Sequence, residues 1–172
     1  MKIVIFGAGG FLGTKLMKIL SKDYEVIGTD INGKEGMTKL DATNKQEIKV
    51  FLLNHKPDVV IDTIALTSSV ACEKNQELAK KLNYETAKNI AEVCKLISAK
   101  MIFISSSYIF NGEKGDYKET DKANSLLEYS KTKIIAEEEV LKLDNSIVLR
   151  VDIMYGYNGK TKSKRVLKSC GD

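Results

Sequence analysis

The first twenty residues of the chain, Met1-Lys-Ile-Val-Ile-Phe-Gly-Ala-Gly-Gly-Phe-Leu-Gly-Thr-Lys-Leu-Met-Lys-Ile-Leu20, decide its fold. Residues that favour β-structure run from Ile3 to Phe6 and stop at Gly7, and apolar residues then recur at helical spacing from Leu12. A buried strand, a tight glycine turn and a helix N-terminus together hold a pyrophosphate, because backbone N–H groups and the positive end of the helix dipole face the anion. The segment therefore predicts the first βα unit of a dinucleotide-binding domain.

The glycines of this turn follow the spacing G-x-x-G-x-x-G rather than G-x-G-x-x-G. Leu12 stands where the second pattern needs its last glycine, whereas Gly7, Gly10 and Gly13 fit the first pattern. Glycine permits positive φ in the turn and lets the backbone approach phosphate groups closely. We expect cofactor contacts at Gly7, Gly10, Phe11, Leu12 and Gly13, although a glycine turn can also be purely structural.

A length of 172 residues with 43% hydrophobic residues suits one globular domain with a sizeable core. The chain has no apolar run of about 18 residues, so no membrane span is predicted. Its N-terminus enters a strand that carries the charged Lys2, which is unlike a signal peptide. We therefore expect a cytoplasmic protein without a membrane partner.

Cysteine and histidine content argues against a metal site. Cys72, Cys94 and Cys170 make an odd count without C-x-x-C spacing, so we expect reduced, mostly structural thiols. The single histidine, His55, is too few for a usual zinc site and is expected near a helix end at the surface. No metal is predicted.

Basic residues gather only near the end of a chain whose formal net charge is +4. The segment 160–168 carries five Lys and Arg residues and no acid. A nucleic-acid patch and a solvated basic segment both fit this composition. Because no aromatic residues for base stacking are interleaved, we favour the solvated segment and predict no nucleic-acid partner.

Strand and helix patterns alternate along the rest of the chain. Strand patterns cover residues 24–29, 58–62, 101–104 and 146–149, and helical patterns cover 45–54, 76–98 and 126–143. Polar loops are expected at 63–72 and 111–125. This alternation predicts a doubly wound α/β fold of the Rossmann type, a parallel sheet with its ligand at the carboxyl ends of the strands.

Asp30 ends the second predicted strand, about 20 residues after the glycine turn. An acid at this position accepts hydrogen bonds from the adenosine ribose hydroxyls and repels a 2′-phosphate, so NAD is favoured over NADP. Lys34 lies close enough in the sequence to weaken that preference. The alternative is a turn aspartate without a cofactor role.

Two polar groups fall where this fold binds its ligand. Ser105, Ser106 and Ser107 directly follow a strand, and Tyr129 and Lys133 lie one helical turn apart on one face of a helix. A phenol has a pKa of about 10, and a nearby ammonium group stabilises the phenolate, which suits proton transfer at pH 7. The combination with the glycine turn and the strand-end acid is far more specific than the Tyr–Lys pair alone.

These ordered motifs resemble those of the extended short-chain dehydrogenases/reductases, and within that family those of the dTDP-4-dehydrorhamnose reductases. The strand end reads Ser105-Ser-Ser-Tyr-Ile-Phe-Asn-Gly112, and the helix reads Tyr129-Ser-Lys-Thr-Lys133. The resemblance implies that Tyr129 donates a proton to a ketone and that Lys133 supports it and holds the nicotinamide ribose. It also implies that Ser106 polarises the carbonyl and that reduced nicotinamide supplies hydride. Further cofactor contacts are implied at Asp41, Ala42, Ile64, Ala65, Thr67 and Asn83.

The same resemblance divides the chain into two parts. Residues 1–156 correspond to the cofactor domain with its catalytic residues, and 157–172 to the Lys-rich start of a C-terminal substrate domain that is largely absent. A fragment, a naturally shortened form, and a form completed by a second copy or a partner subunit all remain open.

The leading hypothesis is NAD(P)H-dependent reduction of a nucleotide-linked 4-keto sugar. Three departures from the reductase pattern concern the substrate: Ser107 replaces an Asp, Val70 replaces an acid, and residues 122–125 replace a Pro-rich approach. A sugar-nucleotide epimerase also suits the serine cluster, whereas a 4,6-dehydratase would need an Asp-Glu pair that the chain lacks. The alternative from another class is a non-catalytic dinucleotide-binding subunit, like the regulatory subunit of methionine adenosyltransferase.

Overall fold

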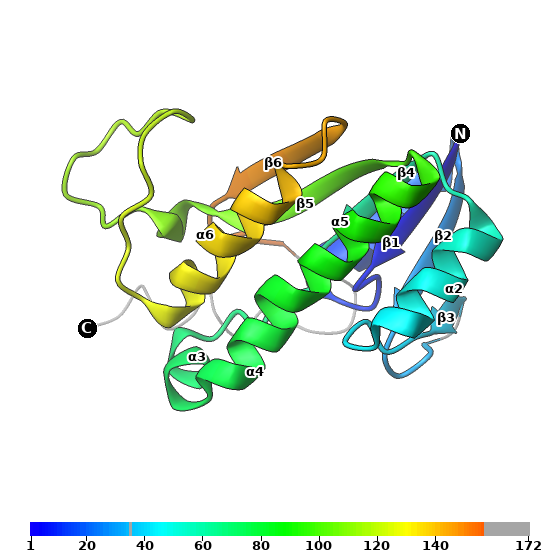
Figure 1. Cartoon of the computed structure of the whole chain (residues 1–172), viewed down its shortest axis with the longest axis horizontal. Coiled ribbons are helices and arrows are strands. Elements are labelled where there is room, and N and C mark those ends of the chain that lie inside the picture. Colours follow the sequence, from blue (N-terminus) through cyan, green and yellow to red (C-terminus); the bar gives the residue numbers. More distant parts are fainter. Residues whose placement is uncertain (35, 157–172) are drawn as a thin grey trace.

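The computed structural model describes residues 1–34 and 36–156. Its centre is a parallel sheet of six strands in the order β3-β2-β1-β4-β5-β6 (Figure 1). The strands are β1 (Lys2–Phe6), β2 (Glu25–Asp30), β3 (Met37–Lys39), β4 (Val59–Asp62), β5 (Lys100–Ser106) and β6 (Ser146–Val151). This topology confirms the predicted doubly wound α/β class.

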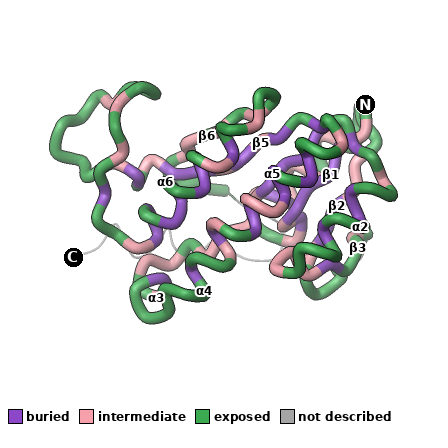
Figure 2. Tube along the Cα trace, in the orientation of Figure 1, coloured by how far each residue is buried: buried purple, intermediate pink, exposed green. Residues whose placement is uncertain are grey.

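Helices cover both faces of the sheet. On one face, α2 (Lys45–His55), α5 (Thr86–Ile97) and α6 (Glu128–Val140) lie side by side over the strands (Figure 1). On the other face, α1 (Phe11–Leu20) packs over β1 and β2. Buried residues follow the strands and the sheet-facing sides of the helices, so the core lies in these two interlayers (Figure 2).

The predicted helix over 76–98 forms as three consecutive segments. They are α4 (Gln76–Lys80), the π-helical turn η1 (Lys81–Glu85) and α5. Thr86 Oγ1 donates to the Lys81 carbonyl at 3.1 Å, across this wider turn. A single π turn hardly disturbs apolar spacing, so the sequence pattern showed one continuous helix. Such turns are frequent at functional sites.

Three short elements were not predicted. They are β3, the helix α3 (Ser69–Lys74) inside the expected loop 63–72, and the 3-10 turn η2 (Ser107–Ile109) after β5. Each is too short to show a hydrophobic period. Local caps stabilise the last two: Ser68 Oγ accepts from Ala71 N at 3.3 Å, and Ser106 Oγ accepts from Tyr108 N at 3.2 Å.

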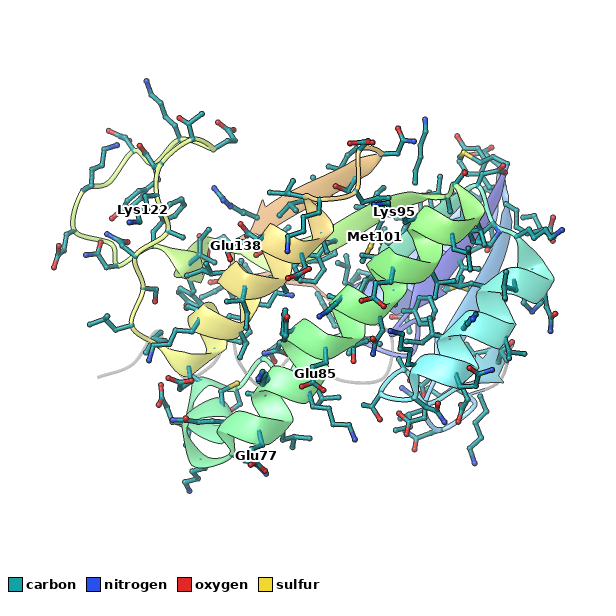
Figure 3. All side chains as sticks on the ribbon, viewed as in Figure 1. Glu77, Glu85, Lys95, Met101, Lys122 and Glu138 are labelled. Carbon is teal, nitrogen blue, oxygen red and sulfur yellow. The ribbon has the colours of Figure 1, made fainter. Side chains whose placement is uncertain are left out.

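The outer faces of the helices carry charge. Glu77, Glu85 and Lys95 are exposed along α4, η1 and α5, whereas Met101 lies buried at the start of β5 (Figure 3). Within residues 1–34 and 36–156, no helix is long and apolar enough to cross a membrane. The predicted Lys-rich segment and the start of a second domain, 157–172, lie outside the described residues.

Candidate functional site

The carboxyl ends of the central strands surround a cavity of ≈ 260 Å³. It lies between the glycine turn after β1, the end of β2, and the segments that follow β3 and β4. Seven of the residues predicted to bind cofactor line it: Gly7, Gly10, Asp30, Asp41, Ala42, Ile64 and Ala65. Residues that sequence reasoning did not single out complete the wall: Thr29, Ile31, Leu40, Thr43, Thr63, Leu82 and Thr86.

The glycine turn presents the start of α1 to this cavity. Gly10 is the N-cap, no described side chain caps the helix, and its first turn contains no acid. The early backbone N–H groups of α1 are therefore available to an anion. Gly13 permits this geometry, because a Cβ there would lie only 2.4 Å from the Gly7 carbonyl oxygen.

Asp30 and Lys34 meet over Gly9 at the rim of the cavity. A Cβ on Gly9 would lie 2.1 Å from Asp30 Oδ2 and 2.8 Å from Lys34 Nζ, so this glycine makes room for both side chains. Lys34 Nζ donates to the Gly9 carbonyl at 2.6 Å, and Asp30 Oδ1 accepts from Asn32 N at 2.9 Å. Opposite charges therefore flank the expected ribose position, and the role of Gly9 had not been predicted.

Asp41 is fixed as a carboxylate beside the cavity. Its Oδ1 accepts from Thr43 N at 2.9 Å and from Thr43 Oγ1 at 2.8 Å. Those two hydrogen bonds lower the pKa of Asp41 below its ordinary value, although partial burial opposes them. An ionised carboxylate here is an acceptor suited to the amino group of a base.

Asn83 holds the cofactor-side loop from within η1. Its side chain is fully buried; Oδ1 accepts from Leu66 N at 2.7 Å, and Nδ2 donates to Leu66 O at 3.3 Å and to Thr132 Oγ1 at 3.0 Å. Asn83 thus joins the loop after β4 to α6 and does not line the cavity. Asn83 therefore supports the loop that carries Ile64, Ala65 and the exposed Thr67, for which cofactor contacts were predicted.

Replacement of Asn83 by alanine is expected to lower the free energy of unfolding by about 2 kcal/mol, because the buried Leu66 backbone groups lose their partners. Urea unfolding followed by circular dichroism measures this change. Asn89→Ala, on the partly buried side of α5, is the matched control and should change stability by less than about 1 kcal/mol. Equal effects of the two substitutions would contradict a special role for Asn83.

The end of β5 and the start of α6 form one rigid corner. Ser106, 7% exposed, accepts from Tyr108 N, and the Tyr108 carbonyl accepts from Ser130 Oγ at 2.6 Å. Glu73 of α3 accepts from Glu128 N at 2.9 Å and so caps α6. These bonds place Ser106 beside the first turn of α6, which carries Tyr129. The Ser106 hydroxyl keeps its proton free to donate.

Tyr129 is 8% exposed and packs with Cys72, Ala79 and Leu66. Thr132 Oγ1 donates to the Tyr129 carbonyl at 2.7 Å and accepts from Asn83, so this turn of α6 is tied to η1. The tyrosine packs against neighbours on α3, which was not predicted, and on α4, which was predicted only as part of one longer helix. These supporting residues carry no sequence signal of their own.

Lys133 points into the protein interior one turn after Tyr129. Its side chain is 1% exposed, Nζ has no hydrogen-bond partner among the described residues, and Nζ lies 3.8 Å from the centroid of the Phe103 ring. Burial lowers the pKa of Lys133 to about 8, while the charges of Asp62 and Glu137 oppose that decrease. A buried ammonium without an acceptor suits a ligand that supplies hydroxyl oxygens.

The predicted residues thus fall into two groups along one edge of the sheet. Residues of one group line the cavity, where the adenosine is expected. In the other group, Ser106 ends β5, and Tyr129 and Lys133 lie one turn apart on α6, which packs on β5. Phe11, Leu12 and Gly13 lie at the start of α1 outside the cavity wall.

Among described residues, no cluster of His, Cys, Asp and Glu could hold a metal ion. Cys72 and Cys94 are buried free thiols, as expected.

Known proteins with similar sequences point to one family. A family model described as the RmlD substrate binding domain matches residues 1–171. The chain is 33% identical over 171 residues to the dTDP-4-dehydrorhamnose reductase of Aggregatibacter actinomycetemcomitans, covering 97% of this chain and 56% of that protein. It is 31% identical over 158 residues to methionine adenosyltransferase 2 subunit beta of Xenopus laevis, covering 90% and 47%.

A solved structure has the same fold. The dTDP-4-dehydrorhamnose reductase of Bacillus anthracis, crystallised in complex with NADP, superposes with a TM-score of 0.84 at 28% identity, covering 92% of this chain and 55% of that chain. The chain spans about half the length of the relatives it matches.

Proposed function

Because the chain belongs to the RmlD substrate binding domain family, we propose that it provides the cofactor site and the proton-donating residues of an NAD(P)H-dependent reductase for a nucleotide-linked 4-keto sugar. The observation that supports this proposal best is the corner where β5 meets α6. Ser106 and the first turn of α6 are fixed to each other there through Tyr108 and Ser130. In this proposal, residues 1–156 form the cofactor-binding domain with the catalytic residues.

The residues present fit a nicotinamide dinucleotide. The cavity walled by Asp30 and Asp41 would take the adenosine, and the uncapped start of α1 would face the pyrophosphate. The orphaned ammonium of Lys133 would gain acceptors from a ribose. When bound, a reduced nicotinamide supplies hydride to the carbonyl carbon.

The chain's own residues handle the proton and the carbonyl. Ser106 donates its free hydroxyl proton as a hydrogen bond to the carbonyl oxygen, and Tyr129 transfers its phenolic proton to that oxygen. The ammonium of Lys133, one turn away, stabilises the phenolate that remains. Fixed placement of the corner lowers the entropic cost of bringing these groups to the ketone.

Cofactor preference is set by two opposite charges. The sequence led us to expect NAD because of Asp30, but Lys34 Nζ lies beside Asp30 over Gly9, and the related B. anthracis structure contains NADP. These two observations favour NADP over NAD. We propose that this pair discriminates between NADH and NADPH, because Asp30 repels the 2′-phosphate of NADPH and Lys34 attracts it.

Substitutions of the two residues should shift preference in opposite directions. Lys34→Met is expected to weaken NADPH binding by about two- to fivefold with little effect on NADH, because one exposed charge contact contributes up to about 1 kcal/mol. Asp30→Asn should instead improve NADPH relative to NADH. Fluorescence titration of both cofactors measures the ratio, with Lys22→Met after α1 as a charge-matched control. Parallel shifts in the two variants would reject this assignment.

The proposed function is tested by binding and turnover with the same protein. We expect NADPH or NADH fluorescence to report binding, and a dTDP-linked 4-keto sugar to cause oxidation of the bound cofactor, followed by the loss of absorbance of the reduced nicotinamide. Absence of cofactor binding would reject every cofactor-dependent function. Interconversion of two sugar-nucleotide epimers without net oxidation of the cofactor would instead indicate an epimerase.

A second candidate function is a non-catalytic dinucleotide-binding subunit. The similarity to methionine adenosyltransferase 2 subunit beta, at 31% identity, favours it. Cofactor binding without turnover, together with co-elution with a methionine adenosyltransferase catalytic subunit, would support this function over the reductase.

A further inference from the structure

Asp62 is a buried acid that the proposed reaction does not use. It is the last residue of β4 and is only 1% exposed. The strand register places it beside Phe6 of β1 and Phe103 of β5, which both belong to the core between the sheet and the helices α2, α5 and α6. Its Oδ1 accepts one hydrogen bond, from Ile64 N at 2.9 Å. Burial raises the pKa of Asp62 to about 6, against the lowering effect of Lys133 and this hydrogen bond.

Phe103 connects Asp62 to Lys133. Phe103 is the neighbour of Asp62 in the sheet. Lys133 Nζ lies over the Phe103 ring, 3.8 Å from its centroid. The acid and the ammonium therefore occupy the same apolar interlayer, and each lowers the electrostatic cost of charging the other. No hydrogen bond joins Lys133 to Asp62 among the described residues.

The other charged groups around this pair are already engaged or neutral. Glu137, one turn after Lys133 on α6, pairs with Arg150 of β6 through bonds of 2.8 to 3.2 Å. Cys94 of α5 stays a neutral thiol, because burial and the charge of Asp62 raise its pKa to about 12. Ser105 of β5 is buried without a partner and is uncharged. Among the described residues around Lys133, Asp62 is thus the acid that is not paired with another basic side chain.

We propose that Asp62 is a positioning residue that keeps Lys133 charged in the interior beneath Tyr129, an inference whose catalytic meaning rests on the proposed reductase function. Without Asp62, the ammonium would face the Phe103 ring and a glutamate already neutralised by arginine. The amine would then release its proton near neutral pH, and the support of the Tyr129 phenolate would be lost. Asp62 thus acts on the reaction through Lys133 and touches no reacting atom.

The titration of Lys133 in the full chain without cofactor tests this inference. Protein labelled with ¹³C and ¹⁵N lysine is titrated by NMR, and the Lys133 signal is assigned by its loss in Lys133→Met. We expect Asp62→Asn to weaken proton binding at Lys133 by about tenfold or more, a change of one pKa unit. Asp58→Asn, just before the same strand and exposed, makes the same charge change and should leave the Lys133 titration near wild type.

The reciprocal measurement keeps the test decisive if Asp62→Asn does not fold. The ¹³C carboxyl signal of Asp62 should titrate at higher pH in Lys133→Met than in wild type, and by the same factor, because coupling between two sites is reciprocal. An unchanged Lys133 titration in Asp62→Asn, or an unchanged Asp62 titration in Lys133→Met, would overturn the inference. Cofactor binding is measured separately, so its absence would reject the proposed function while the titration still decides the coupling.

A kinetic readout separates positioning from a general loss of structure. In the active protein, Asp62→Asn should move the alkaline limb of the pH–kcat profile to lower pH, because Lys133 must stay protonated to support the Tyr129 phenolate, whereas Asp58→Asn should not move it. A uniform loss of kcat at every pH, with the profile unmoved, would contradict the assigned role.

Discussion

Replacement of Tyr129 by phenylalanine is expected to lower kcat for the keto sugar about 10²- to 10⁴-fold, the usual contribution of a positioned proton donor. The ring still fills its place against Cys72, Ala79 and Leu66, so the corner of β5 and α6 should remain intact. NADPH affinity should therefore stay close to that of the wild type. Steady-state kinetics and cofactor fluorescence measure the two quantities on one preparation.

Tyr108→Phe is the matched control for this substitution. Tyr108 is 46% exposed, and its hydrogen bonds to Ser106 and Ser130 use only its backbone, which phenylalanine keeps. We expect kcat within about twofold of wild type for this variant. If Tyr129→Phe behaves like Tyr108→Phe while NADPH still binds, the non-catalytic subunit becomes the better assignment.

The double substitution Asp62→Asn with Lys133→Met is expected to stabilise the protein at pH 7 by about 1 to 4 kcal/mol, even though it removes activity. Two charges buried in one apolar interlayer cost more to desolvate than their attraction returns, and neutral groups of similar shape avoid that cost. Urea unfolding across a pH series measures the difference in stability between the variant and the wild type.

The pH dependence of this difference follows from the directions of the two pKa shifts. The pKa of Asp62 is raised from 3.8 to about 6, so its charging penalty is absent below 3.8 and complete above about 6. The pKa of Lys133 is lowered from 10.5 to about 8, so its penalty is complete below about 8 and absent above 10.5. The stabilisation should therefore be largest between about pH 6 and 8 and should decrease toward both extremes.

A surface ion pair provides the control for the double substitution. Lys114 Nζ lies 2.7 Å from Asp121 Oδ2 in the loop after η2. Asp121→Asn with Lys114→Met removes the same two charges but should hardly change the free energy of unfolding, because solvent screens exposed pairs. A destabilised Asp62/Lys133 double variant at pH 7 would show that the buried pair contributes net stability and would contradict the desolvation argument.

The sequence alone predicted the strand–turn–helix at the start, the α/β class and the order of most elements. These features depend on local and periodic properties: the glycine spacing from Gly7 to Gly13 and the alternation of apolar segments. It also predicted which of the cavity residues come from the carboxyl ends of strands, because parallel topology brings those ends to one edge. Short elements such as α3 and η2 were not predicted, since they are too short to show a repeated hydrophobic pattern.

Only the tertiary structure decided how the candidate site is supported. Glu73 and Ser130 received no role from the sequence, and Asn83 was expected only as a cofactor contact. The supporting roles of all three arise from hydrogen bonds across 17 to 55 residues of chain. Gly9 became informative only when Asp30 and Lys34 were seen above it. The sequence by itself thus determined the fold and the residue types of the site, through local spacing. The burial of Asp62 with Lys133 was decided by packing of α6 on β5 and of α5 on β4, because burial and charge coupling are properties of neighbours brought together in space.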